Sequence, residues 1–244
     1  MENITIIAQA GFLILTAASV AVFYRALRNS KTFLAIILAW ILVQGAISLA
    51  GFYTLTNSLP PRLTLLVAPP LLFIALLFLT VRGRKFIDQL DLKWLTIIHF
   101  VRIPVELILF YLFLQKAIPE LMTFEGRNLD IISGITAALA LWVYSSNWKW
   151  KRGFLIGWNL VCLALLVNIV TIAILSAPFP FQQLAFHQPN IAVLHFPFIY
   201  LPGVIVPFVF FAHLVAIRRL VRKEATTSST QWQGKSASQV SVLS

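Results

Sequence analysis

Three ionisable side chains interrupt one long apolar run of this sequence. His99, Arg102 and Glu106 stand at spacings of three and four residues within residues 94–115. On a helix these spacings place the three side chains within about 60° of one another and over about 10 Å of rise. A hydrocarbon environment penalises such groups, so ionisable residues inside a membrane span indicate a functional site by default. We therefore predict that the three residues form the binding site for a small polar solute or ion.

Each of the three side chains has a distinct chemical role in this prediction. Arg102 would bind an anionic group, Glu106 would bind a cation or exchange a proton, and His99 would contact the ligand or a proton nearer the cytoplasmic end. Arg102 and Glu106 are also i, i+4 neighbours, for which we expect a direct ion pair. One alternative is structural, because a buried ion pair would also attach this helix to its neighbours. Pro104, which lies between the two charges, lacks a backbone N–H and predicts a kink.

Two further histidines lie in the last apolar run of the chain. His213 is expected at a depth similar to that of His99, and His195 lies about 27 Å away along the helix axis. His99 and His213 could therefore ligate one metal ion or the iron of a haem. Zinc normally takes three or four protein ligands, so no metal site is assigned. A membrane-embedded metal- or haem-dependent enzyme remains an alternative function, and the sequence identifies neither catalytic residues nor a cofactor.

Two loops between apolar runs are longer than a tight connection requires. Their carboxylates and imidazoles are suited to a divalent cation or a basic ligand, although no compact ligand spacing is present. We predict that these loops form a polar outer mouth above the bundle. Its candidate residues are Glu120, Glu125, Arg127, Asp130, His187 and His195.

The last apolar run also contains prolines at intervals of five residues. Repeated prolines interrupt the helical hydrogen bonds and provide places where a helix bends. We predict a gate or hinge formed by Pro197, Pro202, Gly203 and Pro207. The same run has no lysine, which excludes a retinal Schiff base there.

The elements that position these residues are apolar runs of about bilayer length. The chain has 244 residues, of which 59% are hydrophobic and 11% are charged, and its mean hydropathy is +0.88. Soluble domains carry about 25% charged residues, so this chain needs lipid as part of its solvent. A bilayer core requires about 20 helical residues per crossing. The predicted spans are 4–26, 33–55, 63–81, 94–115, 130–147, 153–177 and 191–217. The predicted fold is all-α, with one seven-helix transmembrane domain over residues 1–224.

The distribution of basic residues predicts the orientation of these helices. One set of loops and the C-terminal end hold 15 of the lysines and arginines, whereas the other side holds 3. Positive loops face the cytoplasm, so we expect the N-terminus outside and the C-terminus inside. Residues 82–93 are expected to form a short amphipathic segment at the cytoplasmic surface. The composition of residues 225–244 predicts a disordered cytoplasmic tail.

Composition also limits the partners of the protein. The net charge of +11 is concentrated at the ends of apolar runs, which indicates membrane topology and excludes nucleic acid as a partner. Cys162 is the only cysteine, which excludes an intrachain disulfide and a four-cysteine metal site. The expected location is a plasma membrane or a bacterial inner membrane, with the lipid bilayer as the main partner. The predicted function is translocation or sensing of the solute or ion, and the other alternative is an accessory subunit that pairs with another membrane protein.

Overall fold

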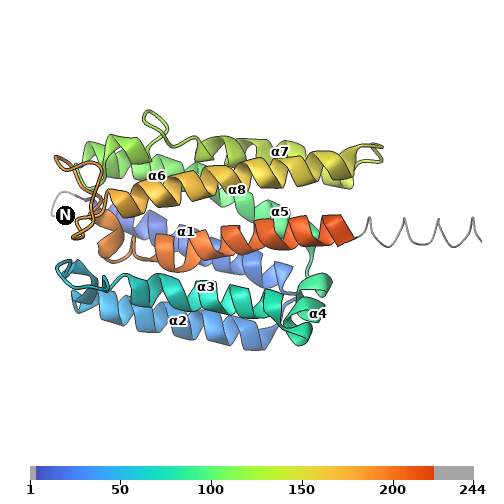
Figure 1. Cartoon of the computed structure of the whole chain (residues 1–244), viewed down its shortest axis with the longest axis horizontal. Coiled ribbons are helices and arrows are strands. Elements are labelled where there is room, and N and C mark those ends of the chain that lie inside the picture. The colour runs from blue at the N-terminus through green and yellow to red at the C-terminus, as the bar shows by residue number, and fades with distance from the viewer. Residues whose placement is uncertain (1–3, 223–244) are drawn as a thin grey trace, which may run out of the picture.

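The computed structural model describes residues 4–222, and within this range the chain forms helices and turns without any β-strand. The all-α prediction is confirmed. The main helices lie side by side in one elongated bundle (Figure 1). They are α1 (Ile6–Ala26), α2 (Lys31–Leu49), α3 (Thr64–Leu79), α4 (Val81–Gln89), α5 (Leu92–Ile97), α6 (Arg102–Leu114), α7 (Asp130–Ser145), α8 (Lys151–Leu175) and a last helix, Leu201–Arg222. The tail predicted at 225–244 lies outside the described residues.

Short 3₁₀ or π segments connect or interrupt these helices. They are η1 (Phe52–Thr54), η2 (Ile98–Val101), η3 (Glu120–Met122), η4 (Ala192–Leu194) and the π segment η5 (Leu201–Ile205). One of them, η2, stands where a proline interrupts the helical hydrogen bonds. Pro104 cannot donate to the carbonyl of Phe100, and the 3₁₀ segment η2 stands at that point between α5 and α6. The kink site predicted near Pro104 therefore coincides with a change of helix type.

Five of the helices are long and apolar enough to cross a membrane, namely α1, α2, the continuous stretch Leu92–Leu114, α8 and the last helix. The pair α3 and α4 is apolar enough when taken together but is bent by 94°, the geometry of a broken span or a re-entrant loop, and α7 is a shorter apolar helix of 16 residues. Large apolar side chains such as Ile7, Leu42 and Leu79 are exposed on the outer faces. In water these faces would be unfavourable, so the chain is a multi-pass membrane protein in contact with lipid.

The second predicted span, 33–55, is wrong at its C-terminal end. The helix α2 stops at Leu49, and Gly51 takes a left-handed conformation with φ 72°. A glycine in this conformation just after a helix is a common stop signal, because side chains are disfavoured there. The residues that follow turn into η1 and do not extend the helix.

The seventh predicted span, 191–217, is also displaced. The helix begins at Leu201 and runs to Arg222, so Pro197 lies in the preceding turn and not in the helix. Pro202 is tolerated in the first turn, where backbone N–H groups have no partner within the helix. Pro207 has no N–H for the carbonyl of Gly203, and Trp40 Nε1 donates to that carbonyl at 3.0 Å.

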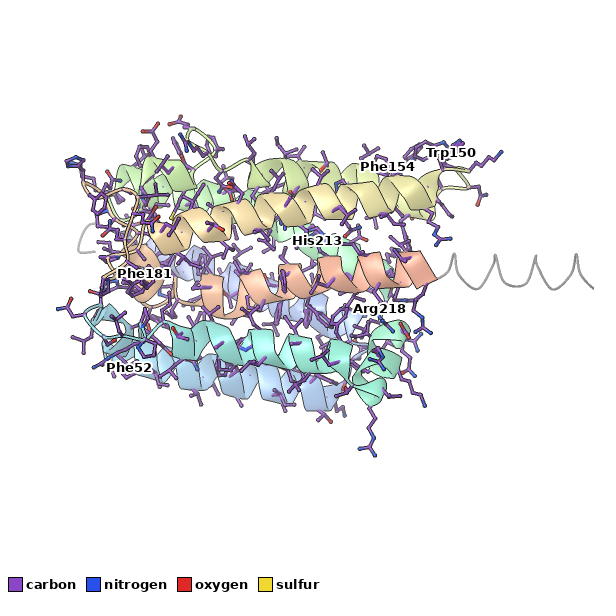
Figure 2. All side chains as sticks on the ribbon, in the orientation of Figure 1. Phe52, Trp150, Phe154, Phe181, His213 and Arg218 are labelled. Atoms are coloured by element: carbon purple, nitrogen blue, oxygen red, sulfur yellow. The ribbon has the colours of Figure 1, made fainter. Side chains whose placement is uncertain are left out.

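The amphipathic segment predicted at 82–93 is largely the helix α4. Arg84 donates to the carbonyl of Leu79 at 2.8 Å, which caps the end of α3 and supports the sharp turn. Asp88 pairs with Arg218, and with Arg222, at the end of the last helix. Figure 2 shows Arg218 beside α4, whereas the labelled phenylalanine and tryptophan residues lie at the two ends of the bundle. These contacts hold α4 across the end of the bundle.

Candidate functional site

The centre of the bundle contains a buried ion pair between two helices. Arg102 Nη1 lies 2.9 Å from Asp130 Oδ1, and the two side chains are 3% and 7% exposed. The expected direct ion pair of Arg102 with Glu106 is therefore wrong. Asp130, at the start of α7, offers its carboxylate from a second helix, whereas the Glu106 side chain is bonded elsewhere. Asp130 belongs to this central pair and not to an outer mouth.

The close approach of α7 depends on Gly134. A Cβ atom at this position would lie 2.8 Å from Ile103 Cγ1 and 3.2 Å from Arg102 Cβ. Because Gly134 has no side chain, α7 reaches the start of α6. Small residues permit such close packing between membrane helices. One turn earlier in α7, Asp130 is thereby held within ion-pair distance of Arg102.

His213 extends the network toward the last helix and α8. Arg102 Nη2 lies 3.0 Å from His213 Nε2, and His213 Nδ1 lies 2.8 Å from Asn159 Oδ1. Arginine has only donors, so Nε2 must accept. The Asn159 amide donates to the carbonyl of Leu155 at 2.8 Å, so its oxygen accepts from His213 Nδ1. These contacts define a neutral His213 with its proton on Nδ1.

This assignment predicts a spectroscopic result. In a sample labelled with ¹⁵N-histidine, His213 should show a protonated-type signal for Nδ1 and an unprotonated-type signal for Nε2. Replacing Asn159 by leucine removes the acceptor that selects this tautomer, and the two signals should then change. Exposed His187, which has no such pair of contacts, is the internal reference. An Nε2-protonated His213 in the unmodified protein would show that the assignment is wrong.

His99 stacks on His213, with ring centroids 4.1 Å apart and planes inclined by 24°. The edge of Trp158 contacts His99 at 5.2 Å between centroids. Both nitrogens of His213 are occupied by protein partners, so neither has a free lone pair for a metal. The contacts thus give no support to a metal or haem bound jointly by His99 and His213. Residues 4–222 contain no group of three or more potential His, Cys, Asp or Glu metal ligands.

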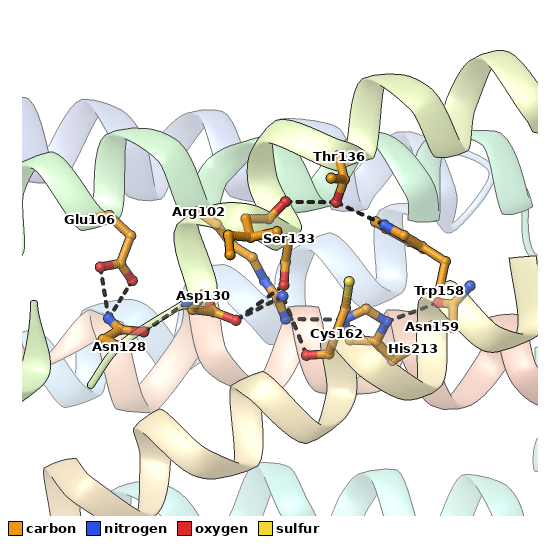
Figure 3. Close-up of polar contacts among 11 residues, drawn as sticks. Arg102, Glu106, Asn128, Asp130, Ser133, Thr136, Trp158, Asn159, Cys162 and His213 are labelled. Carbon is orange, nitrogen blue, oxygen red and sulfur yellow. Dashed lines mark hydrogen bonds and ion pairs between the residues drawn. The ribbon is translucent and has the colours of Figure 1, made fainter. Parts of the chain in front are cut away.

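Glu106 lies at the other end of the network. Its side chain is 1% exposed, and Asn128 Nδ2 lies 2.7 Å from each carboxyl oxygen. Asn128 also accepts from the backbone N–H of Asp130 at 3.0 Å. Figure 3 shows the resulting order across the bundle. The polar network consists of Glu106, Asn128, Asp130, Arg102, His213 and Asn159.

A small cavity of about 110 Å³ lies beside the Glu106 end of this network. Its polar lining residues are Glu106, Asp130 and Asn190, and its other walls are apolar. The buried side-chain oxygen of Asn190 has no hydrogen-bond partner among the described residues. The polar groups at this cavity include several acceptors, which suits a positively charged or proton-bearing guest.

The remaining predicted site residues lie apart from this centre. Glu120, Glu125, Arg127 and His187 are exposed, and His195 Nδ1 contacts the carbonyl of Ile191 at 2.9 Å. The described contacts do not join these residues to one another, so convergence at an outer mouth stays a prediction. Pro202 and Gly203 lie in the π segment and Pro207 follows it, which leaves the predicted hinge motion a prediction as well.

Sequence reasoning missed the role of Asn128, which is 0% exposed although it lies in a predicted outer loop. Its only sequence signal is its position two residues before Asp130, a spacing at which asparagine often caps the backbone. Asn159 was visible as a polar residue within a span, but its partner His213 is 54 residues away.

Together these features define a class, the multi-pass helical membrane proteins with a buried polar network. A family model described as a domain of unknown function, DUF8737, matches residues 59–221, and the chain belongs to this family. No curated protein and no solved structure matches the chain. The matched residues include the whole polar network.

Proposed function

We propose that this protein binds a small cationic solute or a proton at Glu106 and translocates or senses it. One observation carries the proposal, namely the buried Glu106 carboxyl at the wall of a small, partly open cavity. Helix α6, which holds it, belongs to a 23-residue apolar stretch of membrane-crossing length. Ionisable groups at such a depth mark ion and proton pathways.

The charges around the cavity favour a positive guest. Arg102 is neutralised by Asp130 at 2.9 Å, and the hydrogen bonds of His213 correspond to its neutral form. The Glu106 carboxyl has an amide as its partner, so its ionised form would leave one negative charge uncompensated. Burying such a charge costs several kcal/mol. A proton or a small cation in the cavity removes this cost.

An anionic guest at Arg102 has less support. The two terminal nitrogens of the guanidinium already contact Asp130, His213 and the carbonyl of Cys162. An anion would have to displace Asp130 from a side chain that is 3% exposed. Arg102 therefore acts in this proposal as the residue that positions Asp130 and His213.

The topology that goes with this function has seven crossings, an external N-terminus and a cytoplasmic C-terminus. Its support is the charge asymmetry, because the α4 end of the bundle carries most of the basic residues. The bent pair α3 and α4 would supply one crossing, and the short α7 another. A plasma membrane or a bacterial inner membrane would be its location.

Replacing Glu106 by glutamine tests the proposal. Glutamine keeps the volume and an acceptor for Asn128 but cannot hold a negative charge. Purified protein would be heated at constant ionic strength while choline is replaced by sodium, potassium, ammonium or methylammonium, and while pH is varied. At about 100 times its dissociation constant, the bound cation should raise the midpoint of unfolding by about 5–10 °C in the unmodified protein. Glu106→Gln should abolish this response.

The control is Asp88→Asn, which removes one negative charge at the α4 end of the bundle, outside the Glu106 cavity. It should respond as the unmodified protein does. Proteoliposomes with a pH-sensitive dye and a cation gradient then separate translocation from binding alone. If Glu106→Gln keeps the full cation and pH response of the unmodified protein, the proposed site is wrong.

A further inference from the structure

A second, larger cavity lies on another side of the last helix. It has a volume of about 530 Å³, within the range of about 300–1,000 Å³ that is usual for ligand pockets. Its walls come from α1, α2, α3, α4 and the last helix, and are apolar almost throughout. Among its lining residues, Ile36, Val43 and Phe73 are 53%, 52% and 43% exposed, so the cavity opens toward the lipid side of the bundle. An apolar, laterally open cavity of this kind suits a hydrocarbon chain.

The inner wall of this cavity is hollow for a local reason. Gly203 has no side chain, and the neighbouring wall positions Pro69, Pro70 and Pro207 carry only compact rings. Trp40 lies against this wall and donates to the carbonyl of Gly203 at 3.0 Å. The indole is thereby fixed beside the cavity, where it can report on an occupant.

One end of the cavity lies beneath α4, whose Phe86 is one of the lining residues. Phe86 of α4 stacks on Phe33 of α2, with ring centroids 4.5 Å apart, and both rings line the cavity together with Leu27. The helix α4 is bent by 94° from α3, and the connection between α1 and α2 lies at the same end of the bundle (Figure 1). This end therefore combines an apolar interior with a polar rim.

The rim is cationic. Three lining residues at this end have an exposed basic residue one or two positions away in sequence: Arg28 beside Leu27, Lys31 near Phe33 and Lys85 beside Phe86. The acidic residues near this end have partners other than these three basic residues. Asp88 pairs with Arg218 at 3.4 Å, and the Asp91 carboxylate accepts a hydrogen bond from the backbone N–H of Lys93 at 2.8 Å. Within residues 4–222, Arg28, Lys31 and Lys85 form no salt bridge. This cationic rim can therefore meet an external anion.

We propose that the larger cavity binds an acyl chain of an anionic phospholipid, whose phosphate contacts the cationic rim of Arg28, Lys31 and Lys85. The apolar walls select a hydrocarbon chain, and the rim selects a negative headgroup over a zwitterionic one. The bend between α3 and α4 brings these two features to one end of the cavity. This site is separate from the Glu106 cavity and does not depend on the function proposed there.

Quenching of Trp40 fluorescence tests the proposal. The full-length protein would be placed in phosphatidylcholine vesicles that contain a small, equal fraction of either phosphatidylglycerol or phosphatidylcholine with brominated acyl chains. The difference between the unmodified protein and Trp40→Phe isolates the signal of Trp40 from that of the other tryptophans. Brominated phosphatidylglycerol should quench Trp40 several-fold more than brominated phosphatidylcholine. High salt should reduce this preference.

Two double variants with equal loss of charge complete the design. Lys31→Gln with Lys85→Gln should bring the quenching by the two brominated lipids close to equal at low salt. Lys93→Gln with Lys149→Gln removes two exposed cations away from the cavity and should leave the preference unchanged. Ala39→Phe, at an exposed wall position, should reduce quenching by both lipids. Equal quenching of Trp40 by the two brominated lipids, or a preference that survives loss of Lys31 and Lys85, would overturn the proposal.

Discussion

Replacing Asp130 by leucine should lower the free energy of unfolding by about 3–5 kcal/mol, because removal of one partner leaves the other charge buried without compensation. Arg102 is 3% exposed and would keep its positive charge without the carboxylate now at 2.9 Å. Its remaining contacts with His213 and the carbonyl of Cys162 involve neutral groups. Unfolding of the purified protein in mixed micelles with increasing denaturing detergent, followed by circular dichroism, measures this loss.

The double variant Arg102→Met with Asp130→Leu separates charge from packing. An apolar pair of similar volume often replaces a buried ion pair without loss, so the double variant should be more stable than Asp130→Leu alone. Recovery should be incomplete, because His213 Nε2 loses the donor that now lies at 3.0 Å. Equal instability of the single and the double variant would show that the lost charge is not the cause.

Replacing Gly134 by valine should destabilise the protein by about 1–3 kcal/mol or more, the range found when well-packed interiors are overfilled. The first added carbon alone would approach Ile103 Cγ1 to 2.8 Å and Ile103 N to 3.1 Å. To relieve these contacts, α7 must move away from α6, which also separates Asp130 from Arg102. The same unfolding measurement should show the loss, and the tautomer signals of His213 should change with it.

The control for this change is Gly157→Val on α8. A Cβ atom at Gly157 would meet no heavy atom within 4 Å, so the substitution should be nearly neutral. Ile103→Ala combined with Gly134→Val should recover part of the stability, since it removes the nearest clashing atom. If Gly134→Val is as stable as Gly157→Val, the close approach of α7 is not what positions Asp130.

The helical class of the protein could be predicted from the sequence because hydropathy depends only on local composition. The ends of α2 and of the last helix could not, since they depend on backbone detail. Gly51 stops α2 through a left-handed conformation, and the last helix begins with a π segment that contains Pro202 and precedes Pro207. A hydropathy window treats such residues as weak interruptions, although they determine where helical hydrogen bonds are possible.

The candidate site was found from the sequence only in part. His99, Arg102 and Glu106 were visible because ionisable residues are rare in apolar runs. Their partners were not, because they come from other elements. Asp130 stands at the edge of a predicted span, and the sequence places it in the outer mouth. In the structure the side chain of Asn128 is buried and accepts a hydrogen bond from the backbone N–H of Asp130 at 3.0 Å. Nothing in the local sequence of this loop indicates that Asn128 is buried.

The π segment Leu201–Ile205 lies between the small cavity beside Glu106 and the larger apolar cavity. Leu201, Pro202 and Val206 face the small cavity at Glu106, whereas Gly203, Val204 and Pro207 face the larger apolar one. The same turn of backbone therefore forms one wall of each cavity. A displacement of this turn that widens one cavity narrows the other. A ligand that shifts this turn when it binds in one cavity therefore changes the affinity of the other cavity for its own ligand. The two effects are equal in size, because coupling between two binding sites is reciprocal.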